Sequence, residues 1–534
     1  MAGEDRFILR GPPAVDLEFS SLGEHFMKKL SEHGNKISQI DAVTNEQQTF
    51  LDISIKSQNL AACLRSRGIK PQDVIGVCSE NNLNFCLPVL ASLYLGAICA
   101  PYNPSYTPRE LRHAMDLSPP RIIFCSEYSE SSIAEVLENY HAKVEVIVMG
   151  ESTQYQRHIL MKELCDLSQK NIRFQPYVAP NPKEDVALVL NSSGTTGLPK
   201  GVMLTHHNVL NSIAVLEHPD IMINRNLETV IGYLPFFHSF GISGLLQTLH
   251  RGITMIVMSA FAPDLFLQVI QDYKIRMCLM VPPIIAFLAK HPMVSQYDLS
   301  SLETIACGAA PLSRELHEEF LKRFPGVDIR QGYGLTETAL AVLVIPMKGN
   351  KHGSSGKVVP GTEAKVIDLE TGKPLGPYQE GELCFRGCMI MKGYANNREA
   401  TAETIDSQGW LHTGDIGYYD NDGYFFIIDR LKELIKYKGF QVAPAELEGL
   451  LMSHPAVQDA AVIGVPDDNA GELPRAFVVK KKDVTEEELI AYIEKQVSPH
   501  KRLRGGVEFV EEIPKNPSGK ILRRELRRKV KSKL

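Results

Sequence analysis

Residues 185–201 read DVALVLNSSGTTGLPKG, and they join a buried strand to a loop of glycines and hydroxyl side chains. The apolar, partly β-branched run 185–190 predicts a strand inside a sheet. In the loop, glycine lets successive backbone N–H groups turn toward one anion, the hydroxyl side chains add donors, and Lys200 adds charge. A flexible linker has a similar composition, but the preceding strand and the lysine favour a polyphosphate site.

The loop does not follow the spacing of a P-loop nucleotide-binding motif. That motif places Gly-Lys before Ser or Thr, whereas here Pro199 precedes Lys200 and Gly201 follows it. A P-loop kinase or ATPase is therefore disfavoured.

Outward from this stretch, the sequence alternates short apolar runs with helical patterns, which predicts an α/β fold. Strands are expected at 73–78, 121–125 and 144–149, with a helix at 58–67. After residue 430 the pattern changes to a small α+β arrangement, with strands at 424–428, 460–465 and 476–480 and helices at 444–452 and 485–496. We predict a large N-terminal domain of several subdomains, 1–431, and a small mobile C-terminal domain, 432–534.

Composition is that of a soluble globular protein. The 534 residues include 44% hydrophobic and 22% charged residues, so disordered, collagen-like and coiled-coil classes are excluded. A net charge of −6 gives no reason to expect a nucleic-acid partner. Ten scattered cysteines without a Cys-x-x-Cys pair indicate reduced thiols rather than disulfides or a zinc site.

Neither a secretory signal nor a transmembrane helix is expected. The N-terminus is acidic and lacks an apolar stretch. The uncharged segment 85–101 is too short to span a bilayer, and glycine and proline interrupt 229–250. A buried helix or a pocket wall is the favoured interpretation of both segments.

Four further motifs follow the loop in order: QGYGLTE at 331–337, GWLHTGD at 409–415, DRLKELIK at 429–436 and PSGK at 517–520. Together with the loop they resemble the signatures of the adenylate-forming superfamily, which includes acyl-CoA synthetases, 4-coumarate–CoA ligases and beetle luciferases. Five collinear motifs are far more specific than any one of them. Within the superfamily, the chain is similar to insect fatty acyl-CoA synthetases and beetle luciferases.

The resemblance implies ATP, Mg²⁺ and coenzyme A as cofactors. Thr336 would contact the α-phosphate, Glu337 would hold Mg²⁺, Asp415 and Arg430 would bind the ribose, and Ala310 and Tyr333 would pack against adenine. The full set of nucleotide-binding residues implied in this way is Ser192, Ser193, Gly194, Thr195, Thr196, Gly197, Lys200, Ala310, Gly332, Tyr333, Asp415 and Arg430.

The resemblance also implies two half-reactions served by different lysines. Lys520 would stabilise the charge that develops at phosphorus during adenylation, and His238 would line the acyl site near the carboxylate. Lys432 would lie at a hinge, Lys436 would face the thioester-forming site, and Lys438 and Gly439 would lie on the coenzyme A face. Read without the resemblance, these lysines are solvated charges and His238 is a structural histidine in an apolar setting.

The implied acyl pocket contains Phe240, Cys307, Gly308, Ala309 and Leu340. Beetle luciferases usually have serine at the positions of Cys307 and Leu340, and arginine at that of Ser212. The two apolar exchanges favour a medium- or long-chain fatty acid, because apolar walls gain from buried chain. The expected activity is therefore fatty acid–CoA ligation. A luciferase-type monooxygenase, an aromatic acid–CoA ligase of the 4-coumarate type and a catalytically inactive binding protein remain alternatives.

The sequence ends in Ser532, Lys533 and Leu534. A terminal S-K-L is an address read by the peroxisomal import receptor, although the tripeptide can occur by chance at the end of a basic helix. Peroxisomal localisation is the expectation, with the chain as a monomer or weak dimer.

Overall fold

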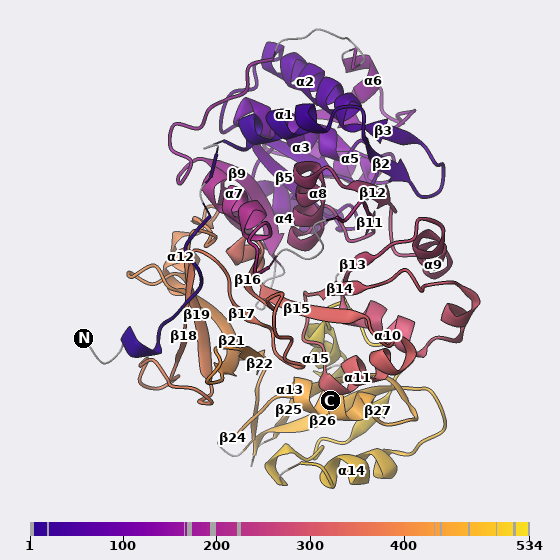
Figure 1. Cartoon of the computed structure of the whole chain (residues 1–534), viewed down its shortest axis with the longest axis vertical. Helices are drawn as coiled ribbons and strands as arrows, with labels where there is room; N and C mark the ends of the chain where they lie inside the picture. Colours follow the sequence, from indigo (N-terminus) through magenta and orange to yellow (C-terminus); the bar gives the residue numbers. More distant parts are fainter. Residues whose placement is uncertain are drawn as a thin grey trace.

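The computed structural model places two domains one below the other (Figure 1). It describes residues 5–15, 17–18, 21–164, 166–167, 174–192, 199–221, 226–431, 433–437, 440–467, 470–497, 499–515 and 519–531. The N-terminal domain is large and the C-terminal domain small, and both mix helices with strands, as expected for the α/β class.

An eight-stranded sheet forms the centre of the N-terminal domain, in the order β20-β10-β9-β5-β4-β6-β7-β8. Its strands are β4 (Val74–Cys78), β5 (Ile98–Tyr102), β6 (Ile122–Cys125), β7 (Glu145–Val148), β8 (Ile159–Leu160), β9 (Val186–Ser192), β10 (Lys200–Thr205) and β20 (Gly393–Tyr394). Strands β4 to β9 run parallel where they pair, and β10 returns antiparallel to β9 with Ser192 opposite Lys200. The two ends of the candidate phosphate loop therefore lie on adjacent strands.

Two further sheets line the side of the domain that carries the cavity described below. One has the order β11-β12-β2-β3, with β2 (Ile37–Asp41), β3 (Gln47–Thr49), β11 (Thr229–Gly232) and β12 (Thr254–Val257). The other has the order β13-β14-β15-β16-β17, with β13 (Met277–Met280), β14 (Thr304–Cys307), β15 (Asp328–Gly334), β16 (Ala341–Val344) and β17 (Lys357–Val358).

A five-stranded antiparallel sheet completes the N-terminal domain and leads to the C-terminal one. Its order is β1-β18-β19-β21-β22, with β1 (Leu9–Arg10), β18 (Thr362–Ile367), β19 (Gly381–Gly387), β21 (Leu411–Tyr419) and β22 (Phe425–Arg430).

The helices of the N-terminal domain pack around and between these sheets. They are α1 (Leu22–His33), α2 (Phe50–Ser66), α3 (Cys86–Leu95), α4 (Pro108–Leu117), α5 (Glu130–Glu138), α6 (Met161–Leu164), α7 (His206–Val215), α8 (Ser239–Arg251), α9 (Pro263–Asp272), α10 (Pro282–Lys290), α11 (Arg314–Arg323) and α12 (Arg398–Thr404). Short 3₁₀ turns are η1 (Asp5–Phe7), η2 (Pro292–Gln296) and η3 (Thr336–Thr338).

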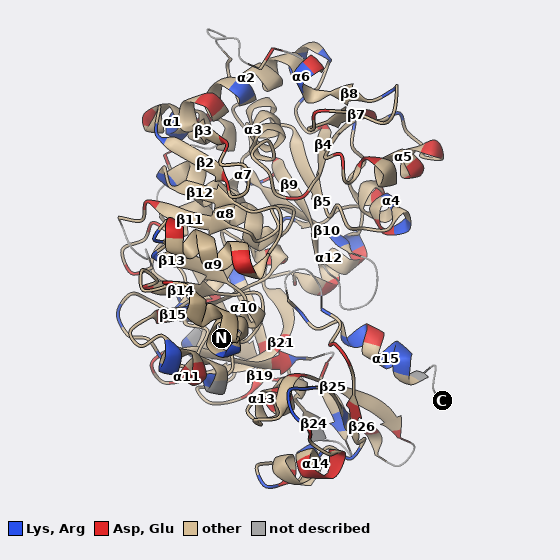
Figure 2. Cartoon of the chain, turned by 90° about the vertical axis from the view of Figure 1, so that its right-hand side faces the viewer, with Lys and Arg blue, Asp and Glu red and all other residues tan. Residues whose placement is uncertain are grey.

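The C-terminal domain has its own sheet, with the order β24-β23-β26-β25 and β27 beside β26. Its elements are β23 (Ile435–Tyr437), β24 (Phe440–Val442), α13 (Pro444–Met452), β25 (Val457–Asp467), β26 (Gly471–Lys480), α14 (Glu486–Glu494), η4 (Pro499–Lys501), β27 (Val507–Phe509) and α15 (Arg523–Lys531). Lys and Arg residues are frequent along α15 (Figure 2).

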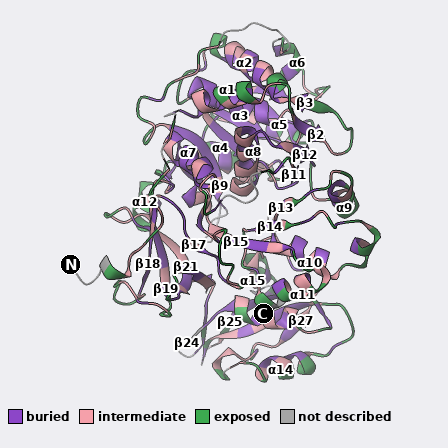
Figure 3. Cartoon of the chain, viewed as in Figure 1, coloured by how far each residue is buried: buried purple, intermediate pink, exposed green. Residues whose placement is uncertain are grey.

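The buried apolar residues form separate cores in the two domains. The central strands and the helices around them are buried, whereas exposed residues lie on outer helix faces and loops (Figure 3). The largest cluster contains residues between Leu22 and Phe425, and a second lies between Ile40 and Ile329. The main cluster of the C-terminal domain is built entirely from residues at Ile435 and beyond.

The predicted strands and the two C-terminal helices are confirmed to within a few residues, but the first helix is longer than predicted. Helix α2 begins at Phe50 because Thr49 and Asp52 form a capping box before it. The segment 85–101 forms α3 and most of β5, and 229–250 forms β11 and most of α8. Among the described residues, no helix combines the length and the apolar character needed to cross a bilayer.

Candidate active site

A cavity of about 530 Å³ lies between the sheets of the N-terminal domain and reaches residue 520 of the C-terminal domain. Many residues predicted for the site line it together: Ser192, Lys200, His238, Phe240, Cys307, Gly308, Ala309, Gly332, Thr336, Glu337, Leu340, Arg430 and Lys520. Residues from five separate motifs, more than 300 positions apart, thus surround one space.

Lys520 brings an ammonium group into the cavity close to charged and polar groups of the N-terminal domain. Burial, followed by the positive charge of Arg430, lowers its pKa to about 8, although the carboxylate of Asp415 acts in the opposite direction. A buried cation beside another cation favours binding of an anion, because an anion would offset both the burial of the charge and the repulsion between the two cations.

His238 is the N-cap residue of α8, and its ring nitrogen Nδ1 accepts a hydrogen bond from the backbone N–H of Phe240 at 3.3 Å. Burial, followed by the charge of Lys520, lowers the pKa of His238 to about 4. The imidazole is therefore neutral at neutral pH, with Nε2 as its remaining donor. A neutral ring can donate a hydrogen bond to a ligand but brings no positive charge to it.

Asp415 and Arg430 lie opposite each other on the paired strands β21 and β22. Arg430 Nε is 3.3 Å from Asp415 Oδ1, and the hydroxyl of Tyr333 donates to Asp415 Oδ2 at 2.6 Å. Burial raises the pKa of Asp415, while Arg430 and the Tyr333 hydroxyl oppose that effect by stabilising the carboxylate. The arrangement presents a buried carboxylate that can accept hydrogen bonds from neighbouring hydroxyl groups of a ligand.

Thr336 and Glu337 lie in η3, which contacts β9 and β10, and both line the cavity. The Thr336 hydroxyl donates to Ser239 Oγ at 3.4 Å, and the Tyr394 hydroxyl donates to Glu337 Oε1 at 2.9 Å. Lys200 Nζ lies 4.5 Å from the centre of the Tyr394 ring. A carboxylate has about four lone-pair positions, so Glu337 retains oxygen acceptors suited to a hard cation such as Mg²⁺.

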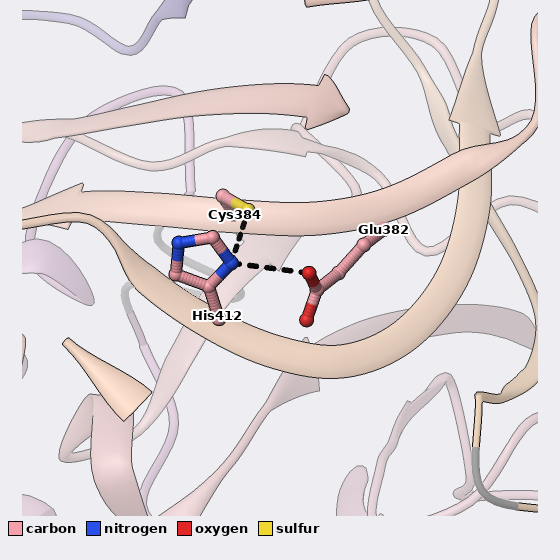
Figure 4. Close-up of side chains that lie close together, drawn as sticks. All are labelled: Glu382, Cys384 and His412. Atoms are coloured by element: carbon pink, nitrogen blue, oxygen red, sulfur yellow. Dashed lines mark hydrogen bonds and ion pairs between the residues drawn. The ribbon is translucent and has the colours of Figure 1, made fainter. Parts of the chain in front are cut away.

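A group that sequence reasoning did not single out, Glu382 with Cys384 and His412, adjoins this site (Figure 4). His412 Nδ1 lies 3.0 Å from Glu382 Oε2 and 3.6 Å from Cys384 Sγ, and Glu382 Oε1 accepts the backbone N–H of Gly414 at 2.9 Å. The hydrogen bond to Glu382 raises the pKa of His412, and burial raises that of the Cys384 thiol.

The three ligand atoms lie within 4.8 Å of one another, as in a metal site. Both oxygens of Glu382 already receive hydrogen bonds, however, and the thiol is kept protonated. We therefore interpret the group as a support for the turn at Gly414, whose left-handed φ of +68° favours glycine. The turn leads directly into Asp415.

Other predicted residues are not brought to the cavity or lie outside the described part. Lys436 is exposed on β23, with its backbone N–H donating to Glu472 Oε2 at 2.8 Å. Asp415, Ala310 and Tyr333 are not among the lining residues, and the adenine-packing role of the last two stays a prediction. Outside the described residues fall Ser193, Gly194, Thr195, Thr196, Gly197, Lys432, Lys438, Gly439 and the terminal tripeptide Ser532, Lys533 and Leu534.

The chain belongs to the AMP-binding enzyme family, whose profile matches residues 26–395; that of the AMP-binding enzyme C-terminal domain matches residues 446–520. The adenylate-forming superfamily expected from the five motifs is thereby confirmed, and the family uses ATP.

Relatives in this family have different named activities. The chain is 45% identical to luciferin 4-monooxygenase of Photuris pensylvanica, covering 99% of this chain and 100% of that protein. It is 42% identical to 4-coumarate–CoA ligase 2 of Nicotiana tabacum, covering 95% and 94%. The crystal structure of ATP-bound MatB from Rhodopseudomonas palustris superposes with a TM-score of 0.85 at 26% identity, covering 95% and 99%.

Proposed function

We propose that this enzyme is an AMP-forming fatty acid–CoA ligase. In the first half-reaction, a fatty acid carboxylate attacks the α-phosphorus of ATP, and pyrophosphate leaves. In the second, the thiol of coenzyme A attacks the acyl carbonyl, and AMP leaves. The observation that carries the proposal is one cavity that is lined by Lys520, by Arg430, which pairs with Asp415, and by apolar side chains that include Phe240 and Leu340.

The residues present fit the needs of the first half-reaction. Two anions must approach each other, so a dry site with fixed cationic donors stabilises the transition state. Lys520 and Lys200 supply the charges, Thr336 supplies a hydroxyl, and neutral His238 can donate Nε2–H to the carboxylate. Glu337 would hold Mg²⁺, which when bound would shield the negative charge of the phosphates.

For the second half-reaction, the exposed position of Lys436 supports a different arrangement of the domains. Lys520 lines the cavity, whereas Lys436 lies away from it on β23. A rotation of the C-terminal domain about a hinge at Lys432 would exchange the two lysines and bring Lys438 and Gly439 to coenzyme A. Hinges of this kind are a few positions that absorb large changes in φ and ψ.

The proposed acid is supported by the apolar character of the acyl wall. Cys307 is buried, and Leu340 lines the cavity beside Phe240. A hydroxyl at either position would favour a polar or aromatic acid, which is the alternative represented by luciferase-type and 4-coumarate-type activities. We expect Leu340→Ser to lower kcat/KM for fatty acids several-fold and to raise it for luciferin-like acids. An unchanged acid preference would contradict the assignment of this wall.

The chemistry is tested by measuring the half-reactions separately in two variants. Lys520→Ala should lower pyrophosphate release by about 10²–10³ while thioester formation from supplied acyl-AMP continues. Lys436→Ala should do the reverse. Equal loss of both half-reactions in either variant, or formation of ADP in place of AMP by the unmodified enzyme, would overturn the proposal.

We also propose that the enzyme is imported into peroxisomes through Ser532, Lys533 and Leu534. Support comes from the sequence of the tripeptide, which is the form that the import receptor reads. Removal of these three residues should leave turnover unchanged and make a tagged protein cytosolic. Peroxisomal fluorescence after removal would contradict the assignment.

A further inference from the structure

Helix α8 forms one wall of the cavity along its whole length. Its N-cap is His238, near the reacting carboxylate of the proposed ligase, and its last residue is Arg251. The lining residues of α8 recur at helical spacing on one face: Ser239, Phe240, Ser243, Gly244, Gln247, Thr248 and Arg251. Thirteen residues at about 1.5 Å each give a wall of roughly 20 Å.

Around the second half of this wall, the cavity is lined mainly by aliphatic and thioether side chains. They come from the segment that follows α7, from β11, from β12 and from the residue before β12: Leu216, Ile221, Leu227, Val230, Ile253 and Met255. Such a lining suits an alkyl chain, because burying methylene groups away from water is favourable.

The far end of the wall is polar, because Gln247 and Arg251 line the cavity there and Glu217, which is not a lining residue, pairs with both. We call Glu217, Gln247 and Arg251 the polar floor. Gln247 Nε2 donates to Glu217 Oε1 at 2.7 Å, and Arg251 Nε lies 3.5 Å from the same oxygen. The side chains of Arg251 and Glu217 are only 13% and 27% exposed. Gln247 Oε1 is buried without a hydrogen-bond partner among the described residues.

A methyl group pressed against the polar floor would remove its remaining hydration and could not supply a hydrogen bond. Buried charges and unsatisfied polar atoms are costly, so an alkyl chain long enough to reach the floor loses what its last methylenes gain. The polar floor therefore limits the length of the alkyl chain that binds well.

The geometry sets the length of the chain that fits. Side chains of a helix lean toward its N-terminus, so an extended Arg251 side chain points back along the wall. With bonds of about 1.5 Å, it occupies roughly 6 Å of the wall's length. About 14 Å of the wall remains for the acyl chain. An extended alkyl chain with C–C bonds of about 1.5 Å advances roughly 1.3 Å per carbon.

We propose that the polar floor measures acyl length and makes the enzyme selective for medium-chain acids of about 10–12 carbons. This inference rests on the proposed ligase function and names the substrate class within it. It assigns Arg251, with Glu217 and Gln247, as specificity-determining residues.

The test is a series of saturated acids from C6 to C18, assayed with the full-length enzyme by AMP formation. For the unmodified enzyme, kcat/KM should rise about three- to fourfold per carbon, the factor equivalent to about 0.8 kcal/mol, and then level or fall beyond C12. A continued rise to C18 would overturn the inference. Absence of AMP with every acid would instead contradict the ligase function itself.

Two variants move the limit in opposite directions. Glu217→Gln with Arg251→Ala removes the charges together, and should raise kcat/KM for C14 and C16 at least tenfold relative to C8. Gly244→Val narrows the cavity halfway along α8, where an added Cβ would meet Leu279 Cδ1 at 3.1 Å, and should move the limit below C10.

The matched control is Glu303→Gln with Arg276→Ala, which removes an exposed ion pair that does not line the cavity. For this control variant, kcat/KM should depend on acid length in the same way as for the unmodified enzyme. If the double variant at the floor and Gly244→Val both keep that dependence too, with thermal unfolding showing that they are folded, the floor does not measure length.

Discussion

At the scale of single residues, Lys520 determines how adenylation should depend on pH. Its pKa, lowered to about 8 by burial, means that the ammonium loses its proton in mildly alkaline solution. Because kcat/KM reports ionisations of the free enzyme, kcat/KM for pyrophosphate release should fall as the pH passes through about 8. Lys520→Arg should react more slowly but lack this alkaline fall, since a guanidinium keeps its proton.

Lys274→Gln is the matched control, because Lys274 forms an exposed ion pair with Asp298. In this variant, kcat/KM for pyrophosphate release should fall at the same alkaline pH as in the unmodified enzyme. A fall at pH 8 that persists in Lys520→Arg would show that another group titrates.

A second residue-scale prediction concerns the stability contributed by His412. Its folded-state pKa is raised chiefly by the hydrogen bond to Glu382, so protonated His412 favours the folded state. The contribution is fully present below the unfolded pKa of about 6.5 and is lost as the pH rises through the raised folded pKa.

Denaturant unfolding of His412→Gln and the unmodified enzyme from pH 5 to pH 9 tests this. The difference in unfolding free energy should be largest at pH 5 and shrink with rising pH. The side chain is 28% exposed, so about 1 kcal/mol or less is expected. A difference that grows with pH would contradict the pairing.

At the scale of elements, the start of α15 is held close to Lys520, the residue that we propose stabilises charge during adenylation. Arg523, three residues after Lys520, makes two hydrogen bonds to Glu448 of α13, at 2.8 and 2.7 Å. The two side chains are 10% and 12% exposed. Breaking a buried pair by removing one partner costs about 3–5 kcal/mol, because the other charge stays buried.

Glu448→Gln should therefore lower the unfolding temperature of the C-terminal domain and also slow pyrophosphate release. Glu446→Gln, two residues earlier on α13, removes an ion pair with the partly exposed Lys501 and should cost at most about 1 kcal/mol. Scanning calorimetry and initial rates measure the two effects. Equal effects of the two substitutions would show that the Glu448–Arg523 pair does not hold α15.

Elements were predictable where local pattern and burial agree. The aromatic and β-branched run before residue 429 predicted the strand observed as β22. The start of α2 was missed because the capping residues Thr49 and Asp52 lie outside the stretch that shows helical periodicity. In α8 the glycines looked like interruptions, yet a Cβ at Gly241 would come within 2.0 Å of Pro235 O, so one glycine permits close packing.

The candidate site was predictable only in part for a related reason. Motif residues such as Lys520 and Thr336 could be identified because each lies in a short recognisable pattern. Tyr394, which donates to Glu337, and Glu382, which holds the Gly414 turn, are 57 and 32 positions from their partners. Contacts over such separations leave no local signal, so the structure was needed to find them.

At the scale of the whole molecule, the two domains have separate cores joined by a small apolar cluster of Ile416, Leu434 and Ala443. Of the five sheets in the described part of the chain, four lie entirely before residue 431. A chain ended at Leu431 should therefore fold, with a cooperative thermal transition, and retain nucleotide binding by Asp415 and Arg430. Its pyrophosphate release should be about 10²–10³ lower, the loss expected for one removed donor.

Circular dichroism and nucleotide titration of the truncated chain test this expectation. The full-length Lys520→Ala variant is the comparison, since both proteins lack the same ammonium. Aggregation of the truncated chain, or undiminished pyrophosphate release, would contradict the division into two cores.

Among the described residues that line the cavity, Lys520 alone comes from beyond residue 431. If the proposed function holds, the residues that select the acid and the residue that accelerates its activation lie in different stretches of the chain. Either property can therefore change in evolution while the other stays constant. A hybrid that carries the last hundred or so residues of a relative should show the relative's rate of adenylation but keep this enzyme's preference among acids.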